Sequence, residues 1–161
     1  MKDVREFLKE KSLLFKKSET TIVGLGNIYR SDDGFGIEAA QRLKKAGFAG
    51  SYTETECIDE IILDLCNKKI PGLIIFLDSS DFEGRPGELK IFSEEDIDDE
   101  TGSHKIPVKL YMKLLGKSGK QSYLIAVKPE TLENKFEPSM SVSVDKTITD
   151  LVSNLCKQFD D

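Results

Sequence analysis

The fold of this chain is decided by the stretch Thr21-Ile-Val-Gly-Leu-Gly-Asn-Ile-Tyr-Arg-Ser-Asp-Asp-Gly-Phe-Gly36. Its apolar start predicts a buried strand, its glycines predict a tight turn, and two acids, Asp32 and Asp33, open a helix. In α/β proteins a turn of this kind brings polar side chains to the carboxyl edge of a sheet, where ligands bind. Acids at a helix start can also cap free N–H groups, a role that suits Asp32. Asp33 is therefore the first candidate site residue.

The rest of the chain alternates between strand and helix patterns. We expect strands over 20–25, 51–57, 72–78, 88–92 and 122–127. We expect helices over 3–15, 33–46, 59–69, 106–115 and 143–158. Apolar side chains at helical spacing should face inward, among them Val4, Phe7 and Leu8 in the first helix and Leu110, Tyr111, Leu114 and Leu115 in the fourth. This alternation predicts a three-layer α/β/α sandwich, with a mostly parallel, five-stranded twisted sheet and helices on both faces.

Chain organisation follows from the same pattern. We expect an N-terminal helical extension over residues 1–19 and a single α/β domain over 20–161. A strand order of 2-1-3 would place the first and third strands side by side and create a switch point, a crevice at their carboxyl ends.

A second carboxylate ends the apolar strand Gly72-Leu-Ile-Ile-Phe-Leu-Asp78. A carboxylate in this place is usually partly buried, and burial costs free energy unless a partner compensates it. A turn or capping acid is the alternative, but Asp81 suits that role better. Asp33 and Asp78 should therefore overlook the same crevice.

The single histidine of the chain, His104, precedes Pro107 at the start of a predicted helix. A lone histidine is often a surface or helix-end residue. An imidazole together with two carboxylates nevertheless suits a borderline divalent metal such as zinc or nickel. We therefore expect Asp33, Asp78 and His104, from three separate elements, to form a metal site.

Other kinds of site find little support. The glycine turn leaves a nucleotide-binding α/β protein as an alternative. Tyr29 argues against it, because it stands where a dinucleotide-binding turn would need its third glycine, and the Walker pattern is also missing. No cofactor-binding residue is therefore predicted. The chain has no Gly-x-Ser-x-Gly motif. Cys57, Cys66 and Cys156 share no metal-binding spacing, and the last two should be buried free thiols.

Composition limits the partners. With 39% hydrophobic and 32% charged residues the chain reads as a soluble globular protein, and a net charge of −6 argues against nonspecific nucleic-acid binding. No apolar run approaches the roughly 20 residues of a membrane helix, and the charged N-terminus is not a secretory signal. We expect a cytoplasmic protein without a nucleic-acid or membrane partner.

Three motifs resemble the nickel–iron hydrogenase maturation endopeptidases. They are Gly-Leu-Gly-Asn-Ile-Tyr-Arg-Ser-Asp-Asp-Gly-Phe-Gly (24–36), Leu-Asp-Ser-Ser-Asp-Phe-Glu-Gly-Arg-Pro-Gly-Glu-Leu (77–89) and Ser-His-Lys-Ile-Pro (103–107). The resemblance runs in order over most of residues 20–157. It implies a phosphorylase/hydrolase-like α/β fold in a protein that is usually a monomer.

The resemblance also implies an activity. Such an enzyme removes the C-terminal propeptide of a hydrogenase large-subunit precursor once nickel is in place. Asp33, Asp78 and His104 match the nickel-contacting residues, and Asp33 and Asp78 the catalytic ones, by a metallo- or an aspartic-type mechanism. Nickel would arrive with the precursor and bind the isolated protein weakly. A module that binds the nickel-loaded precursor without cutting it is the alternative.

One segment departs from the family pattern. A Gly-rich stretch often follows the second strand, whereas this chain reads Glu56-Cys-Ile-Asp-Glu60. In the fold of that family this segment borders the cleft, so the departure leaves open which hydrogenase is the substrate.

Overall fold

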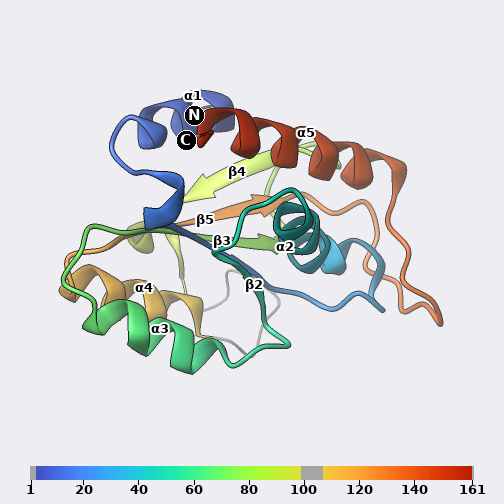
Figure 1. The fold of residues 1–161 in the computed structure, drawn as a ribbon. Helices are drawn as coiled ribbons and strands as arrows, with labels where there is room; N and C mark the ends of the chain where they lie inside the picture. Colours follow the sequence, from blue (N-terminus) through green and yellow to red (C-terminus); the bar gives the residue numbers. More distant parts are fainter. Residues whose placement is uncertain (1–2, 99–106, 161) are drawn as a thin grey trace.

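The computed structural model describes residues 3–98 and 107–160. Its architecture is a three-layer α/β/α sandwich around one five-stranded sheet, as predicted (Figure 1). The strands are β1 (Thr20–Gly24), β2 (Ser51–Thr53), β3 (Leu73–Ser79), β4 (Leu89–Phe92) and β5 (Gln121–Val127). The helices are α1 (Val4–Ser12), α2 (Phe35–Lys45), α3 (Ile58–Asn67), α4 (Val108–Lys117) and α5 (Val142–Gln158).

The strand order is β2-β1-β3-β5-β4. β2, β1, β3 and β5 run parallel, and β4 is antiparallel to β5. The predicted 2-1-3 order is confirmed, because β1 lies between β2 and β3. The carboxyl ends of β1 and β3 are therefore neighbours, which places the residues that follow them at one edge of the sheet.

Two apolar cores lie on opposite faces of the sheet. Helices α1, α2 and α5 cover one face, and α3 and α4 cover the other (Figure 1). Every residue of β3 is buried, and its side chains alternate between the cores, with Ile75 and Leu77 in the first and Ile74 and Phe76 in the second. Burying a side chain of this size contributes about 1.5–3 kcal/mol, so this strand is the centre of the fold.

The first helix is packed against the sheet. Phe7 and Leu8 are buried, as predicted, and the Phe7 ring meets Tyr123 edge-on at 4.9 Å. The Lys11 ammonium donates to Gln121 Oε1 at 2.8 Å and to the Tyr123 hydroxyl at 2.9 Å. These contacts fix α1 over β5; the domain division at residue 19 stays a prediction.

Several local predictions were wrong. β2 ends at Thr53 because the Thr53 N–H donates to Glu56 Oε2 at 2.8 Å, which turns the chain. On α4, Leu110 and Leu114 are exposed and Met112 is buried instead. A different face of this helix therefore packs against the sheet than the one predicted. The cysteines are free, but Cys66 and Cys156 are only half-buried. None of the helices in the described part of the chain is long and apolar enough to cross a membrane.

Candidate active site

The glycine turn lets three backbones approach closely. A Cβ on Gly24 would lie 2.1 Å from the Gly36 carbonyl oxygen, and one on Gly36 would lie 2.0 Å from that of Leu77. Gly26 has a φ of +135°, and a Cβ there would lie 1.8 Å from the Asp33 carbonyl oxygen. The turn therefore packs the start of α2 directly onto the ends of β1 and β3.

This turn is not arranged as a phosphate cradle. The Gly26 N–H donates to the Glu54 carboxylate at 2.5 Å. A carboxylate thus occupies a backbone donor that an anion-binding turn would offer to its ligand. Together with Tyr29 in place of a third glycine, this contact argues against nucleotide binding at the turn.

Asp33 lies at the end of the turn, in the short 3-10 helix η2 (Ser31–Gly34), and is 1% exposed. The Ser79 hydroxyl donates to Asp33 Oδ1 at 2.8 Å. The Arg30 guanidinium lies 3.7 Å from Oδ2. A buried carboxylate needs such partners, since hydrogen bonds and a nearby cation compensate the loss of water.

Asp78 is the penultimate residue of β3 and is also 1% exposed. Its Oδ1 accepts the N–H of Ser79 at 2.7 Å. One residue, Ser79, therefore contacts both carboxylates, the first through its hydroxyl and the second through its backbone. The structure brings Asp33 and Asp78 together at the carboxyl edge of the sheet, where the sequence placed them.

The third predicted ligand, His104, lies outside the described residues. Across residues 3–98 and 107–160, no group of three His, Cys, Asp or Glu side chains is placed to hold a metal ion. Of the three predicted metal ligands, Asp33 and Asp78 are the two that lie in this part of the chain.

Asp32 does not cap the helix, contrary to the prediction. It is fully buried, and its carboxylate accepts four hydrogen bonds from the segment before α5. The donors are Glu130 N at 2.8 Å, Thr131 N at 3.2 Å, Ser141 N at 2.8 Å and Ser141 Oγ at 2.8 Å. Helix α2 begins after Gly34 with no side-chain cap. The two adjacent acids therefore face different partners: Asp32 holds a distant loop, and Asp33 meets Ser79.

The sequence did not reveal the contacts of Ser79 or Glu54. Ser79 lies in an Asp-Ser-Ser run that reads as an ordinary strand end, and Glu54 lies in an edge segment of threonines and glutamates. Their partners are 46 and 28 positions away along the chain. The one local signal is that Ser79 directly follows Asp78.

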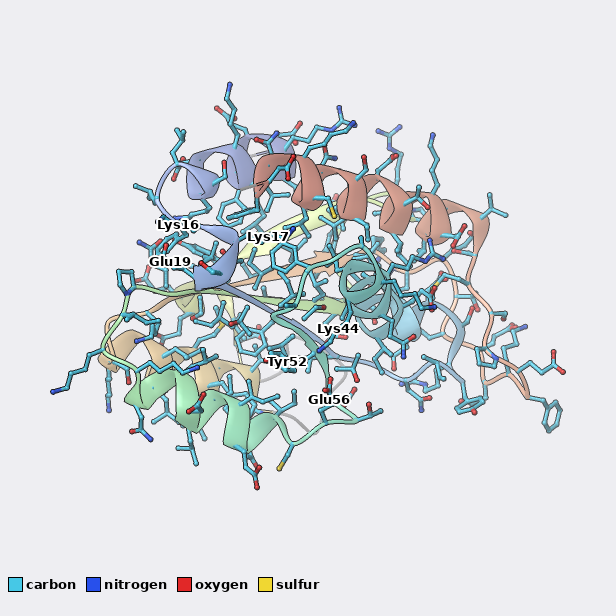
Figure 2. The ribbon with its side chains drawn as sticks, in the orientation of Figure 1. Lys16, Lys17, Glu19, Lys44, Tyr52 and Glu56 are labelled. Atoms are coloured by element: carbon cyan, nitrogen blue, oxygen red, sulfur yellow. The ribbon has the colours of Figure 1, made fainter. Side chains whose placement is uncertain are left out.

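A cavity of about 700 Å³ lies at the opposite edge of the sheet, where β1 and β3 begin. Figure 2 shows this side of the molecule, with Lys17, Glu19 and Tyr52 among the lining residues. The cavity shares no residue with the carboxylate pair. In α/β proteins ligands bind at the carboxyl ends of strands, so the carboxylates, and not this cavity, are the candidate active site.

Comparison with known proteins agrees with this fold. The family model for hydrogenase maturation proteases matches residues 59–158. A protein of Methanocaldococcus jannaschii that is named as a hydrogenase maturation protease is 29% identical over 149 residues, covering 83% of this chain and 91% of the relative.

Solved structures share the architecture. The HycI maturation protease of Thermococcus kodakarensis superposes with a TM-score of 0.72 at 23% identity, over 89% of this chain and 93% of that one. The HycI endopeptidase of Escherichia coli gives 0.67 at 19% identity, over 84% and 88%. These likenesses support the fold, and the family model covers more than half of the chain. The chain belongs to the hydrogenase maturation protease family, and it is an endopeptidase of that family.

Proposed function

We propose that this endopeptidase removes the C-terminal propeptide of a nickel–iron hydrogenase large-subunit precursor after nickel has been inserted. The observation that carries the proposal is the pair of buried carboxylates, Asp33 and Asp78, which Ser79 links at the carboxyl edge of the sheet. The precursor is the partner, and the proposal needs neither a nucleic acid nor a membrane. It places the enzyme in the cytoplasm as a monomer.

In this proposal the nickel ion belongs to the substrate. Asp33, Asp78 and His104 contact the ion that the precursor already holds, since two carboxylates and an imidazole suit a borderline divalent metal. Docking then depends on the metal, so cleavage follows only after nickel insertion. A site with so few ligands of its own should bind free nickel weakly.

Peptide hydrolysis also needs an activated water molecule. A carboxylate within hydrogen-bond reach can accept the proton of that water as a general base, which is the aspartic-type route. A metal ion can instead polarise the scissile carbonyl or lower the pKa of the water, which is the metallo-type route. In both routes Asp33 and Asp78 act on the reacting atoms or on the ion beside them.

The test follows the mass of a nickel-loaded precursor in the presence of the wild type and of Asp33→Asn and Asp78→Asn. Asparagine keeps the side-chain shape but removes the charge and the proton acceptor. We expect the wild type to release the propeptide and both variants to lose at least about 100-fold in rate, as is typical for loss of a catalytic acid or base. Asp81→Asn is the matched control, because Asp81 is exposed and pairs with Lys128.

The competing interpretation is a module that binds the precursor without cutting it. An unchanged precursor mass with the wild type, together with binding, would establish that interpretation. Near-normal processing by Asp33→Asn or Asp78→Asn would remove that residue from the catalytic site.

A further inference from the structure

Arg30 places a positive charge beside the carboxylate pair. Its guanidinium Nη1 lies 3.7 Å from Oδ2 of Asp33, while Oδ1 of Asp33 accepts the hydroxyl of Ser79. The Asp33 side chain is 1% exposed, whereas the Arg30 side chain is 38% exposed. The arginine therefore reaches from solvent towards a buried carboxylate that the proposed function gives to nickel.

The backbone around Arg30 is fixed. The Arg30 N–H donates to the Asn27 carbonyl at 3.0 Å, and the Asp33 N–H donates to the Arg30 carbonyl at 3.2 Å. The next residue, Ser31, is buried and has a φ of +53°, a left-handed conformation that is uncommon for residues other than glycine. Such conformations persist where the surrounding structure holds them, and they cluster at functional sites. The turn thus keeps the arginine next to Asp33.

The contact between the two side chains is an ion pair without the short distance of a hydrogen bond. Charge-assisted hydrogen bonds from nitrogen to a carboxylate measure about 2.7–2.9 Å, and the two atoms here are 3.7 Å apart. Such a contact depends on charge rather than on directional bonding, and water reaches the arginine from outside. The guanidinium can therefore move aside when another cation comes to Asp33.

A guanidinium is always charged in proteins, so Arg30 presents to Asp33 the same sign of charge as a metal ion does. A divalent ion that binds this carboxylate must displace the arginine or lie close to it. Repulsion at such short distances is substantial even near a protein surface. A nickel ion that the precursor already holds has ligands that balance part of its charge, so it meets less repulsion than a free ion.

We propose that Arg30 excludes free divalent nickel from the carboxylate pair, so that nickel reaches Asp33 only when the precursor carries it there. Arg30 acts through Asp33 and takes no part in cleaving the bond. This inference rests on the proposed function, in which the ion arrives with the substrate. It adds the group that makes the isolated enzyme a poor nickel binder.

A purely structural role is the competing explanation. An arginine that only compensates the buried charge of Asp33 would contribute to the stability of the fold. Its removal would then lower the melting temperature and leave the affinity for free nickel unchanged. Nickel affinity is therefore the measurement that separates the two roles.

The test titrates nickel chloride into the purified enzyme at neutral pH, in the absence of precursor, and follows binding by calorimetry. Arg30→Gln removes the charge, and Arg30→Lys keeps it. Arg5→Gln is the matched control, because Arg5 is exposed on α1 and the net charge changes by the same amount. We expect Arg30→Gln to bind nickel at least about tenfold more tightly than the wild type, as removal of a like charge beside a divalent ion implies.

Arg30→Lys and Arg5→Gln should bind nickel as weakly as the wild type. Adding Asp33→Asn to Arg30→Gln should abolish the gained affinity, which would locate the ion at this carboxylate. Equal affinities of Arg30→Gln and the wild type would overturn the proposal. Tight binding that persists in the double variant would overturn it as well, because the ion would then lie elsewhere.

Processing of the nickel-loaded precursor by the wild type is measured separately. If the wild type cuts the precursor and the nickel affinities are equal, the role of Arg30 fails and the proposed function stands. If Arg30→Gln gains affinity through Asp33 but the wild type does not cut, the exclusion of free nickel stands and the proposed function fails.

Discussion

The Ser79 hydroxyl donates a hydrogen bond of 2.8 Å to Oδ1 of Asp33, a residue 46 positions earlier in the chain. The N–H of Ser79 is bonded to the neighbouring Asp78. The end of β3 therefore holds the end of the glycine turn, and the two candidate catalytic carboxylates keep a fixed relation because one serine bridges them. Such preorganisation is what positioned catalytic groups require.

Replacing this serine tests the bridge. Ser79→Ala removes a donor to a buried carboxylate, a loss of about 1–3 kcal/mol in the interactions that position Asp33. We expect kcat for precursor processing to fall at least about tenfold, while the fold and precursor binding are kept. The control is Ser80→Ala, which truncates the adjacent buried serine. If both variants process the precursor at the same rate, Ser79 does not position the site.

Asp32 provides the second prediction, because its contacts distinguish a loop anchor from a helix cap. Asp32→Ala leaves the donors of Glu130, Thr131 and Ser141 without their acceptor and should cost about 2–4 kcal/mol of unfolding free energy. Hydrogen exchange should accelerate at residues 130–141 while the first turn of α2 keeps its protection. Faster exchange confined to the first turn of α2 would support the capping role instead.

The third prediction concerns alkaline pH. Burial, and then the hydrogen bond from its hydroxyl to Asp59, raise the pKa of Tyr111 to about 12. The corresponding value in the unfolded chain is about 10. The folded protein therefore holds this proton more tightly, so the stability it contributes is complete below about pH 10 and is lost as the pH rises towards 12.

Urea unfolding at pH 9 and at pH 11.5 measures this effect. The wild type should lose more unfolding free energy between these values than Tyr111→Phe, which has no phenol to ionise. Tyr29→Phe, at an exposed tyrosine, should behave like the wild type. An identical loss in Tyr111→Phe would show that the contact between α4 and Asp59 in α3 carries no such linkage.

Local sequence patterns were enough to predict a five-stranded, mostly parallel sheet, the 2-1-3 order of its first three strands and the position of the carboxylate pair. Glycine turns and apolar runs are local signals, and parallel strands joined by right-handed crossovers leave few arrangements. Local patterns did not predict the role of Asp32, because the groups that donate hydrogen bonds to it lie about a hundred residues later in the chain. On α4, Leu110 and Met112 are both apolar, so composition could not decide which one faces the core. What the sequence missed depends on contacts between distant segments.

The central claim is that this enzyme cleaves a precursor only when nickel is in place. The most direct measurement incubates the purified enzyme with nickel-loaded and with nickel-free precursor and follows release of the C-terminal propeptide by mass. We expect release from the nickel-loaded precursor and none from the nickel-free one. Equal cleavage of the two precursors would contradict the claim.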